Sequence, residues 1–298
     1  MARAHVDPEA WARKVRRRWI LAITLAALLL VGIGVYYLLR DRILPARRYR
    51  QAEQSLERGA VTEAIDGFSL LEDYRDARAR ASALAYGLQG DDSFARSFAA
   101  AKLGDVLSFG RFEQDGNPDN GPEPIRWFVL AEGEGRLLLW SESVLDRQPF
   151  HERAEDITWA DSSLRTWLND SFYTQAFTPE ERALIAMTRV ETPGNSASRT
   201  RGGRDSRDHV YILSFNELLA FSAFNPRLEG LWAYPTPYAL QRGVTRQQQY
   251  GTCCWWLRLP GVKQDCAGYC DMAGKPLYSG KANARYIGVR PVIWVFLP

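Results

Sequence analysis

The feature that most constrains this chain is an uninterrupted apolar run near its N-terminus, Trp19 to Leu39. The run holds 21 residues and none of them is charged. As a helix rising ~1.5 Å per residue it would be ~31 Å long, close to the thickness of the hydrocarbon core of a bilayer. Trp19 at one end and Tyr36 and Tyr37 at the other are placed as interfacial aromatic residues. The run predicts a retained transmembrane helix rather than a cleaved signal peptide, because it is long and ends in Tyr-Tyr-Leu-Leu-Arg instead of a small-residue cleavage site.

The charges flanking this run give little guidance on orientation, because basic residues are nearly equal on both sides. A tail of 18 residues is too short to be a domain, and long C-terminal domains cross membranes largely regardless of charge. We therefore expect residues 1–18 to be a basic cytoplasmic tail and the C-terminal part to be extracytoplasmic. The whole chain carries +3, but residues 1–50 carry 11 Lys/Arg against 3 Asp/Glu, so the remainder carries −5. A mildly acidic globular part argues against nucleic acid as a partner.

Residues 40–101 have the periodicity of helices. Tyr49, Ala52 and Leu56 recur at spacings of three and four, and Gly59 then interrupts the pattern. The stripe resumes after Thr62, a candidate N-cap, with four further apolar residues: Ala64, Ile65, Phe68 and Leu71. The pattern resembles a tetratricopeptide-type helical hairpin, which is stable only when stacked on a neighbour. We expect a short helical stalk over this interval.

From residue 102 onwards the pattern changes to short alternating runs separated by turn residues. Strands are predicted at 106–109, 125–130, 136–140, 210–213, 254–257 and 289–296. Helices are predicted at 162–168, 179–187 and 217–224, with Ser162 or Ser163 and Thr178 as N-cap types. Residues 102–298 are therefore expected to form one α+β domain.

Several motifs of this domain stand in an order that resembles a bacterial domain-of-unknown-function family, number sixty-two seventy-three. They are Gly104-Asp with Phe109-Gly, Pro124–Trp127, Thr158–Asn169, Phe172 with Ala176-Phe177, Asp208–Ser214, Trp255–Arg258, and Gly288–Pro291 with Trp294. The resemblance implies an extracytoplasmic module that follows a membrane anchor and tetratricopeptide-like helices. The closing motifs also resemble the last strands of C-type-lectin-like folds, an analogy that does not settle function.

No established catalytic pattern is present in the sequence. His151-Glu-Arg-Ala-Glu155 lacks the second histidine of a zinc-protease helix, and neither His151 nor His209 lies in a triad context. Asp115-Gly-Asn-Pro-Asp119-Asn-Gly121 begins like a calcium loop, but the twelfth position is Arg126 rather than a bidentate glutamate. The segment fits a hairpin connection better. We therefore expect no catalytic residue, no metal and no cofactor.

Four cysteines, Cys253, Cys254, Cys266 and Cys270, are grouped within 18 residues. Zinc is disfavoured because adjacent cysteines are poor tetrahedral chelators. Outside the cytoplasm disulfides are favoured, with three possible pairings that the sequence does not distinguish. One or two bridges would join the Trp255-Trp256 strand to the Cys266–Cys270 segment. Formylglycine-generating enzymes share the lectin-like architecture and use a reactive cysteine pair, which gives an envelope enzyme as the alternative function.

Trp255 and Trp256 are the candidate binding residues. Alternation along a strand sends one ring inwards and the other outwards, and an exposed ring can stack on a sugar or anchor a protein partner. Arg258 and Arg290 are expected to be structural, paired with buried carboxylates or carbonyls. The basic segment 196–207 is expected to be a mobile loop. The sequence as a whole predicts a membrane-anchored, non-enzymatic binding or interaction module, with a glycan, the cell wall or an envelope protein as partner.

Overall fold

The computed structural model describes residues 43–58, 60–71, 97–224 and 231–297, together with single positions between residues 29 and 84. The chain divides into two compact units, Met1–Arg78 and Ala79–Pro298, which are described separately. The sequence placed the start of the C-terminal domain at residue 102. The unit boundary lies earlier, and a helical turn at 97–99 belongs to the second unit, where Phe98 packs on Phe109 with ring centroids 5.7 Å apart.

The predicted fold class needs correction at its N-terminus. Among the described residues, no helix is both long and apolar enough to cross a membrane. Most of the interval Trp19 to Leu39 lies outside the described residues, as does the tail 1–18. The apolar composition that led to the prediction is a property of the sequence, whereas a spanning helix also needs a continuous helical length, which no helix among the described residues has. The remaining part of the prediction, a chain of mixed helices and strands, is correct.

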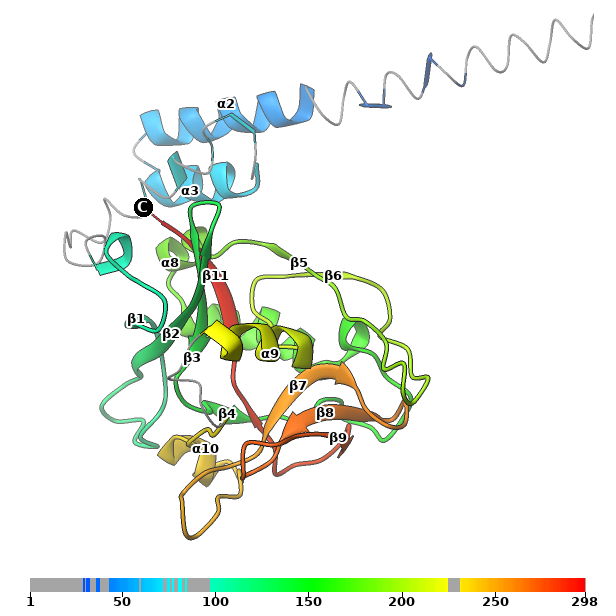
Figure 1. Cartoon of the computed structure of the whole chain (residues 1–298). Coiled ribbons are helices and arrows are strands. Elements are labelled where there is room, and N and C mark those ends of the chain that lie inside the picture. Colours follow the sequence, from blue (N-terminus) through cyan, green and yellow to red (C-terminus); the bar gives the residue numbers. More distant parts are fainter. Residues whose placement is uncertain are drawn as a thin grey trace, which may run out of the picture. The chain divides into compact units, whose positions relative to one another are not determined.

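The first unit contains a hairpin of two helices, α2 (Leu44–Glu57) and α3 (Val61–Ser69) (Figure 1). Tyr49 and Ala52 of α2 and Ala64, Ile65 and Phe68 of α3 are buried, as the stripe predicted, and Tyr49 meets Phe68 edge-on with ring centroids 5.2 Å apart. The N-cap of α3 is Ala60 and not Thr62, and no side chain caps this end. The hairpin agrees with the predicted helix pair, but nothing beyond the pair supports a tetratricopeptide unit.

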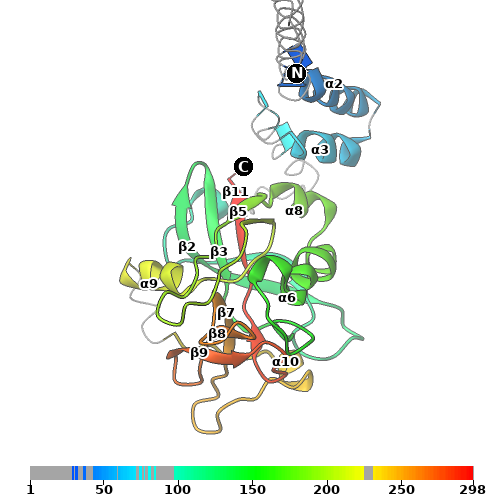
Figure 2. The same ribbon diagram turned by 90° about the vertical axis from the view of Figure 1, so that its right-hand side faces the viewer.

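The second unit is built on two main sheets (Figures 1 and 2). One sheet has the order β1-β2-β3-β11, with bounds Val106–Phe112, Glu123–Gly133, Arg136–Ser141 and Val292–Phe296. The other has the order β4-β10-β7-β8-β9, with bounds Asp146–Arg147, Gly288–Val289, Trp255–Pro260, Cys266–Cys270 and Pro276–Lys281. A small third ladder pairs β5 (Thr188–Val190) with β6 (Ser206–Asp208).

Hairpin connections join the first three strands of this sheet, as the turn residues predicted. β1 and β2 are antiparallel neighbours, so residues 113–122 are the hairpin connection expected in place of a calcium loop. β2 and β3 are joined by Glu134 and Gly135, both with positive φ (52° and 68°). Two successive positive φ angles are typical of the type I′ turn that matches the twist of a hairpin.

The C-terminal strand predicted at 289–296 is divided into two strands that belong to different sheets. Gly288 and Val289 of β10 pair with β7 and β4, whereas Val292 of β11 pairs with Trp140 of β3. Only Arg290 and Pro291 lie between, and proline has no N–H to continue a ladder. This short segment therefore carries the chain from one sheet to the other, and β11, red in Figures 1 and 2, leads away along β3.

Short helices fill the connections of the second unit. They are η2 (Trp159–Asp161), α6 (Ser163–Trp167), the π-helical η3 (Leu168–Phe172), α7 (Tyr173–Ala176), α8 (Pro179–Leu184), α9 (Phe215–Phe224) and α10 (Pro237–Gln241). Ser162 caps α6 by accepting from Arg165 N, and Thr178 with Glu181 forms a full capping box at α8, which confirms both predicted N-caps. Residues 210–213 are buried as expected but form a single bridge, Tyr211 to Val292, rather than a strand.

Candidate functional site

The two predicted binding residues, Trp255 and Trp256, are both fully buried. The indole N–H of Trp255 donates to Leu231 O (3.2 Å), and that of Trp256 donates to Gln148 O (2.9 Å). Their strand, β7, is the middle strand of the five-stranded sheet, and all six of its residues are buried. The expectation that one ring faces solvent is therefore wrong, because both faces of β7 are covered.

Trp255 belongs to a buried group with Trp140 and Arg290, which we call the junction cluster because it lies where the chain changes sheets. The guanidinium carbon of Arg290 is 3.3 Å from the ring centroid of Trp140 and 5.3 Å from that of Trp255. Arg290 Nε donates to Ser141 O (2.9 Å) and Nη2 to Glu142 O (3.2 Å). Burial lowers the pKa of Arg290 to about 9. The residue ties the two sheets together, which fits the structural role predicted for it.

The second predicted structural arginine, Arg258, also serves the core. It is 2% exposed and pairs with Glu217 Oε1 at 3.0 Å. Its remaining donors reach Thr192 Oγ1 and the carbonyls of Glu191 and Ile212. Four of the five N–H donors of this buried guanidinium are thus engaged within the core, and the residue holds the neighbouring segments in place.

The four cysteines are buried free thiols, so the expected bridges are not formed in this structure. Burial raises the pKa of Cys253 to about 12 and that of Cys254 to about 11, and it also raises the pKa values of Cys266 and Cys270. Thiols with raised pKa values are protonated at neutral pH and are poor nucleophiles. The reactive cysteine pair that an enzyme of the formylglycine-generating type would need is therefore not supported by this environment.

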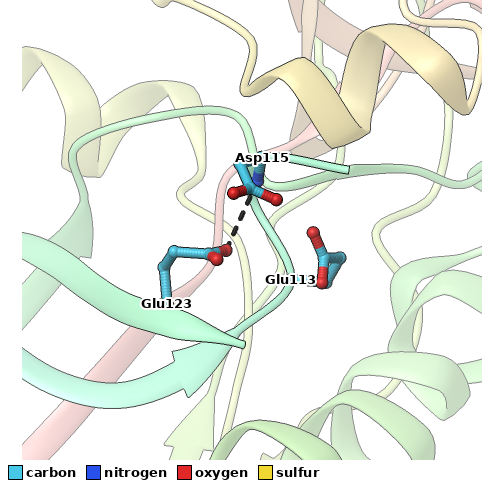
Figure 3. A group of neighbouring side chains, drawn as sticks. All are labelled: Glu113, Asp115 and Glu123. Atoms are coloured by element: carbon cyan, nitrogen blue, oxygen red, sulfur yellow. Dashed lines mark hydrogen bonds between the residues drawn. The ribbon is translucent and has the colours of Figure 1, made fainter. Parts of the chain in front are cut away.

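Three carboxylates, Glu113, Asp115 and Glu123, gather at the hairpin connection between β1 and β2, within 4.8 Å of one another (Figure 3). Each already accepts backbone N–H groups. Glu123 Oε2 takes those of Gln114 (2.7 Å) and Asp115 (3.3 Å), and Glu113 Oε1 takes that of Gly116 (2.7 Å). The side-chain amide of Asn120 lowers the pKa of Asp115. These contacts organise the turn, so the group fits a hairpin connection.

The two histidines of this unit make structural contacts. His151 Nδ1 accepts from Ser163 N (3.2 Å), so Nε2 carries the proton that faces Glu155 Oε1 (2.9 Å). His209 stacks on Tyr173 with ring centroids 4.6 Å apart, and burial lowers its pKa. Among the described residues neither histidine forms a hydrogen bond with the side chain of a serine, threonine or cysteine.

A different set of side chains offers a binding surface: Trp232, Tyr234 and Tyr250, called the aromatic surface below. Their exposed fractions are 54%, 55% and 62%. Trp232 and Tyr234 flank Ala233, which is 1% exposed, so alternation places both rings on the solvent side of one extended segment. Tyr250 follows in a neighbouring loop, where a Cβ built on Gly251 would lie 3.9 Å from the ring of Tyr234.

The segment that carries these rings is held from several sides. Ala233 O accepts from Cys253 N (2.9 Å), Tyr234 O accepts from Val144 N (3.0 Å), and Leu231 O accepts from the indole of Trp255. The indole N–H of Trp232 itself donates to Ala273 O (2.9 Å). A Cβ at Gly274 would lie 2.9 Å from the Trp232 ring, so the close approach of this turn needs glycine. The tryptophan is thus fixed in place while more than half of it faces solvent.

The tryptophans that the sequence indicated are buried, and the exposed Trp232 was not among them. A weak signal for its exposure exists in Trp232-Ala-Tyr234-Pro235, where aromatic and small residues alternate directly before a proline. Proline favours extended backbone in the residue before it and often lies at sheet edges, where one side of the chain stays open to solvent.

The fold and the site together define a mixed α/β domain of two main sheets and a small third ladder, with a preformed aromatic surface and no assembled catalytic group among its described residues. The family model described as Domain of unknown function (DUF6273) matches residues 134–297. This match covers more than half of the chain, and the chain belongs to that family. No curated protein and no solved structure matches the chain.

Proposed function

We propose that the second unit is a binding module that holds a glycan against the aromatic surface. The observation that carries the proposal is Trp232, a large ring that is half exposed yet fixed by a hydrogen bond to Ala273 O and by the close approach of Gly274 in the same turn. A ring held in its binding position loses little conformational entropy when a ligand arrives. Aromatic rings have a negative face, on which the C–H bonds of a pyranose ring can pack.

The polar side chains around the surface favour a glycan over an apolar protein partner. Gln247, Gln248 and Gln249 directly precede Tyr250 in the same loop, and the last two are exposed. Their amides can both donate and accept hydrogen bonds, as the hydroxyl groups of a sugar require. The tyrosine hydroxyl groups add further polar contacts at the edge of the surface.

The enzymatic alternative has less support, because the cysteines are buried with raised pKa values and the histidines are engaged in structural contacts. A C-type-lectin-like fold and an extracytoplasmic location stay predictions. Both would suit a glycan-binding module, but the proposal depends on the aromatic surface alone.

A polysaccharide pull-down with the full-length chain tests the proposal. Insoluble peptidoglycan, chitin and cellulose are incubated with the wild type, with Trp232→Ala and with Tyr234→Ala. Loss of one stacking ring should weaken binding roughly tenfold, about 1.4 kcal/mol. Trp167→Ala is the matched control, because Trp167 is a partly exposed tryptophan of α6 that packs on Phe172. Equal binding by all four proteins, or binding by none, would reject the proposal.

A further inference from the structure

The connection between β5 and β6 lines a shallow hollow of about 650 Å³ that is open to solvent and that the aromatic surface does not include. Its lining comes from one short segment: Gly194, Asn195, Ser196, Arg199, Thr200, Arg201, Gly202 and Gly203. We call this segment the arginine loop. It belongs to the basic stretch that the sequence suggested would be mobile, and it has no part in the glycan site proposed above.

The arginine loop is closed by its own backbone and fastened to the connection between β7 and β8. Asn195 and Thr200 exchange backbone hydrogen bonds in both directions (3.0 and 3.2 Å). Thr200 Oγ1 donates to Gly261 O (2.8 Å), and Arg201 N donates to Gln264 Oε1 (2.9 Å). Gln264 Nε2 donates back to Arg201 O (3.0 Å). The hollow is therefore a built feature with a defined wall.

Backbone geometry confirms how closely this loop is packed. A Cβ at Gly202 would lie 1.7 Å from Thr192 O, which only glycine avoids. Arg199 has a φ of 58°, in the left-handed region that a residue with a long side chain adopts rarely. Such a conformation costs ~1–3 kcal/mol and is most often kept where it serves a site.

The charges around the loop are unequally paired. Arg204 pairs with Asp161 (2.8 Å), and Arg189 pairs with Asp205 (2.6 Å) and Glu191 (3.4 Å). The carboxylates near the loop are thereby engaged. Within the stretches 97–224 and 231–297, Arg199 and Arg201 have no carboxylate within ion-pair distance, although the chain after residue 50 carries −5. Arg199 and Arg201 are both exposed and both line the hollow, so the loop carries local positive charge on an acidic part of the chain.

We propose that the arginine loop binds an oxyanion, a phosphate, sulfate or carboxylate group held by Arg199 and Arg201. The planar guanidinium group matches such anions with two parallel N–H donors, and charge-assisted hydrogen bonds of this kind are the strong ones. The open hollow admits the anion either free or as a substituent of a larger molecule. The site thus adds an anion-selective contact to the unit.

Calorimetric titration of the full-length chain with inorganic phosphate and with acetate, at low ionic strength and against sodium chloride, tests the proposal. Arg199→Gln and Arg201→Gln should each weaken binding of the anion about tenfold, the effect of losing a charge-assisted hydrogen bond. Arg246→Gln is the matched control, since Arg246 is an exposed arginine of the same unit with no ion pair among the described residues. It should bind as the wild type does.

A second arm identifies the source of the anion. Glucose 1-phosphate is compared with inorganic phosphate on the wild type, and tighter binding of the sugar phosphate indicates an anionic glycan rather than a free ion. Amide resonances that shift on addition of phosphate should belong to residues 194–203. If neither phosphate nor acetate binds more tightly than chloride, or if the three arginine variants behave alike, the arginine loop is not an anion site.

Discussion

The junction cluster and the aromatic surface are two aromatic groups with opposite environments. Trp255 is fully buried between the sheets, whereas Trp232, 23 positions earlier, is 54% exposed. The two are physically connected, because the indole of Trp255 donates to the carbonyl of Leu231, next to Trp232. The buried group thus positions the exposed one. A tryptophan serves the core or a ligand according to what covers it, and residue type alone does not distinguish the two roles.

The largest effect is expected from removing the buried ring of the junction cluster. Trp255→Ala should lower the free energy of unfolding by about 3–5 kcal/mol, because it leaves a cavity between two sheets. Chemical denaturation of the wild type and the variant measures the difference. A loss below about 1 kcal/mol would contradict the view that this ring is a core element.

Thiol reactivity should follow the same burial. A pKa raised from 9.0 to about 12 lowers the thiolate fraction of Cys253 at neutral pH roughly a thousandfold. We expect almost no maleimide labelling of the native protein and four labels per chain after denaturation without reductant. Mass spectrometry counts the labels. Fewer than four labels before reduction would instead show that disulfides are present.

Trp255→Phe tests the connection between the two groups. The substitution keeps an aromatic ring but removes the N–H that holds Leu231, so we expect a loss of about 1 kcal/mol in stability and weaker glycan binding. Trp256→Phe is the matched control, because it removes the bond to Gln148 from the same strand and should leave binding unchanged. If the two variants bind the glycan equally well, the hydrogen bond from Trp255 to Leu231 does not position the aromatic surface.

His209 provides a pH-dependent test of burial at a third aromatic contact. Burial holds its pKa in the folded state below the ordinary value of 6.5. The unfolded chain therefore binds the proton more readily, and the stability that the neutral ring contributes is complete above about pH 6.5 and is lost as the pH falls through the folded pKa. Unfolding measured between pH 7 and pH 5 should show a smaller decline in His209→Gln than in the wild type. If the wild type and His209→Gln lose stability to the same extent, titration of groups other than His209 causes the decline.

The smallest effect on stability is expected at the aromatic surface. Tyr250 is 62% exposed, and Tyr250→Ala should change the free energy of unfolding by no more than about 0.5 kcal/mol while weakening glycan binding. Thermal unfolding and the polysaccharide pull-down are measured on the same preparation. A large loss of stability would show that Tyr250 has a structural role, as Trp255 has, and would contradict its assignment to the aromatic surface.

Local features of the fold could be predicted from the sequence. Ser162 and Thr178 cap the helices that they were expected to cap, and the Gly-Asn-Pro-Asp-Asn-Gly segment forms a hairpin connection. These outcomes depend on the preferences of a few adjacent residues, which short-range hydrogen bonds and turn geometry determine. The membrane helix predicted at 19–39 also depended on local sequence evidence alone. No helix among the described residues is long and apolar enough to span a membrane.

What only the tertiary structure decided is which side of each element is covered. A strand with Trp255 and Trp256 predicts one exposed ring if one face of its sheet is open, but β7 is the middle strand and is buried on both faces. Contacts with residues far away in the sequence divide 288–296 between two sheets and leave Trp232 exposed. Such contacts also engage the carboxylates near the arginine loop, so that Arg199 and Arg201 have no carboxylate partner among the described residues. The sequence by itself determined the local elements and the acidic charge of the chain after residue 50. Burial is a property of the packed molecule, and burial is what separates the core tryptophans from the aromatic surface proposed to bind.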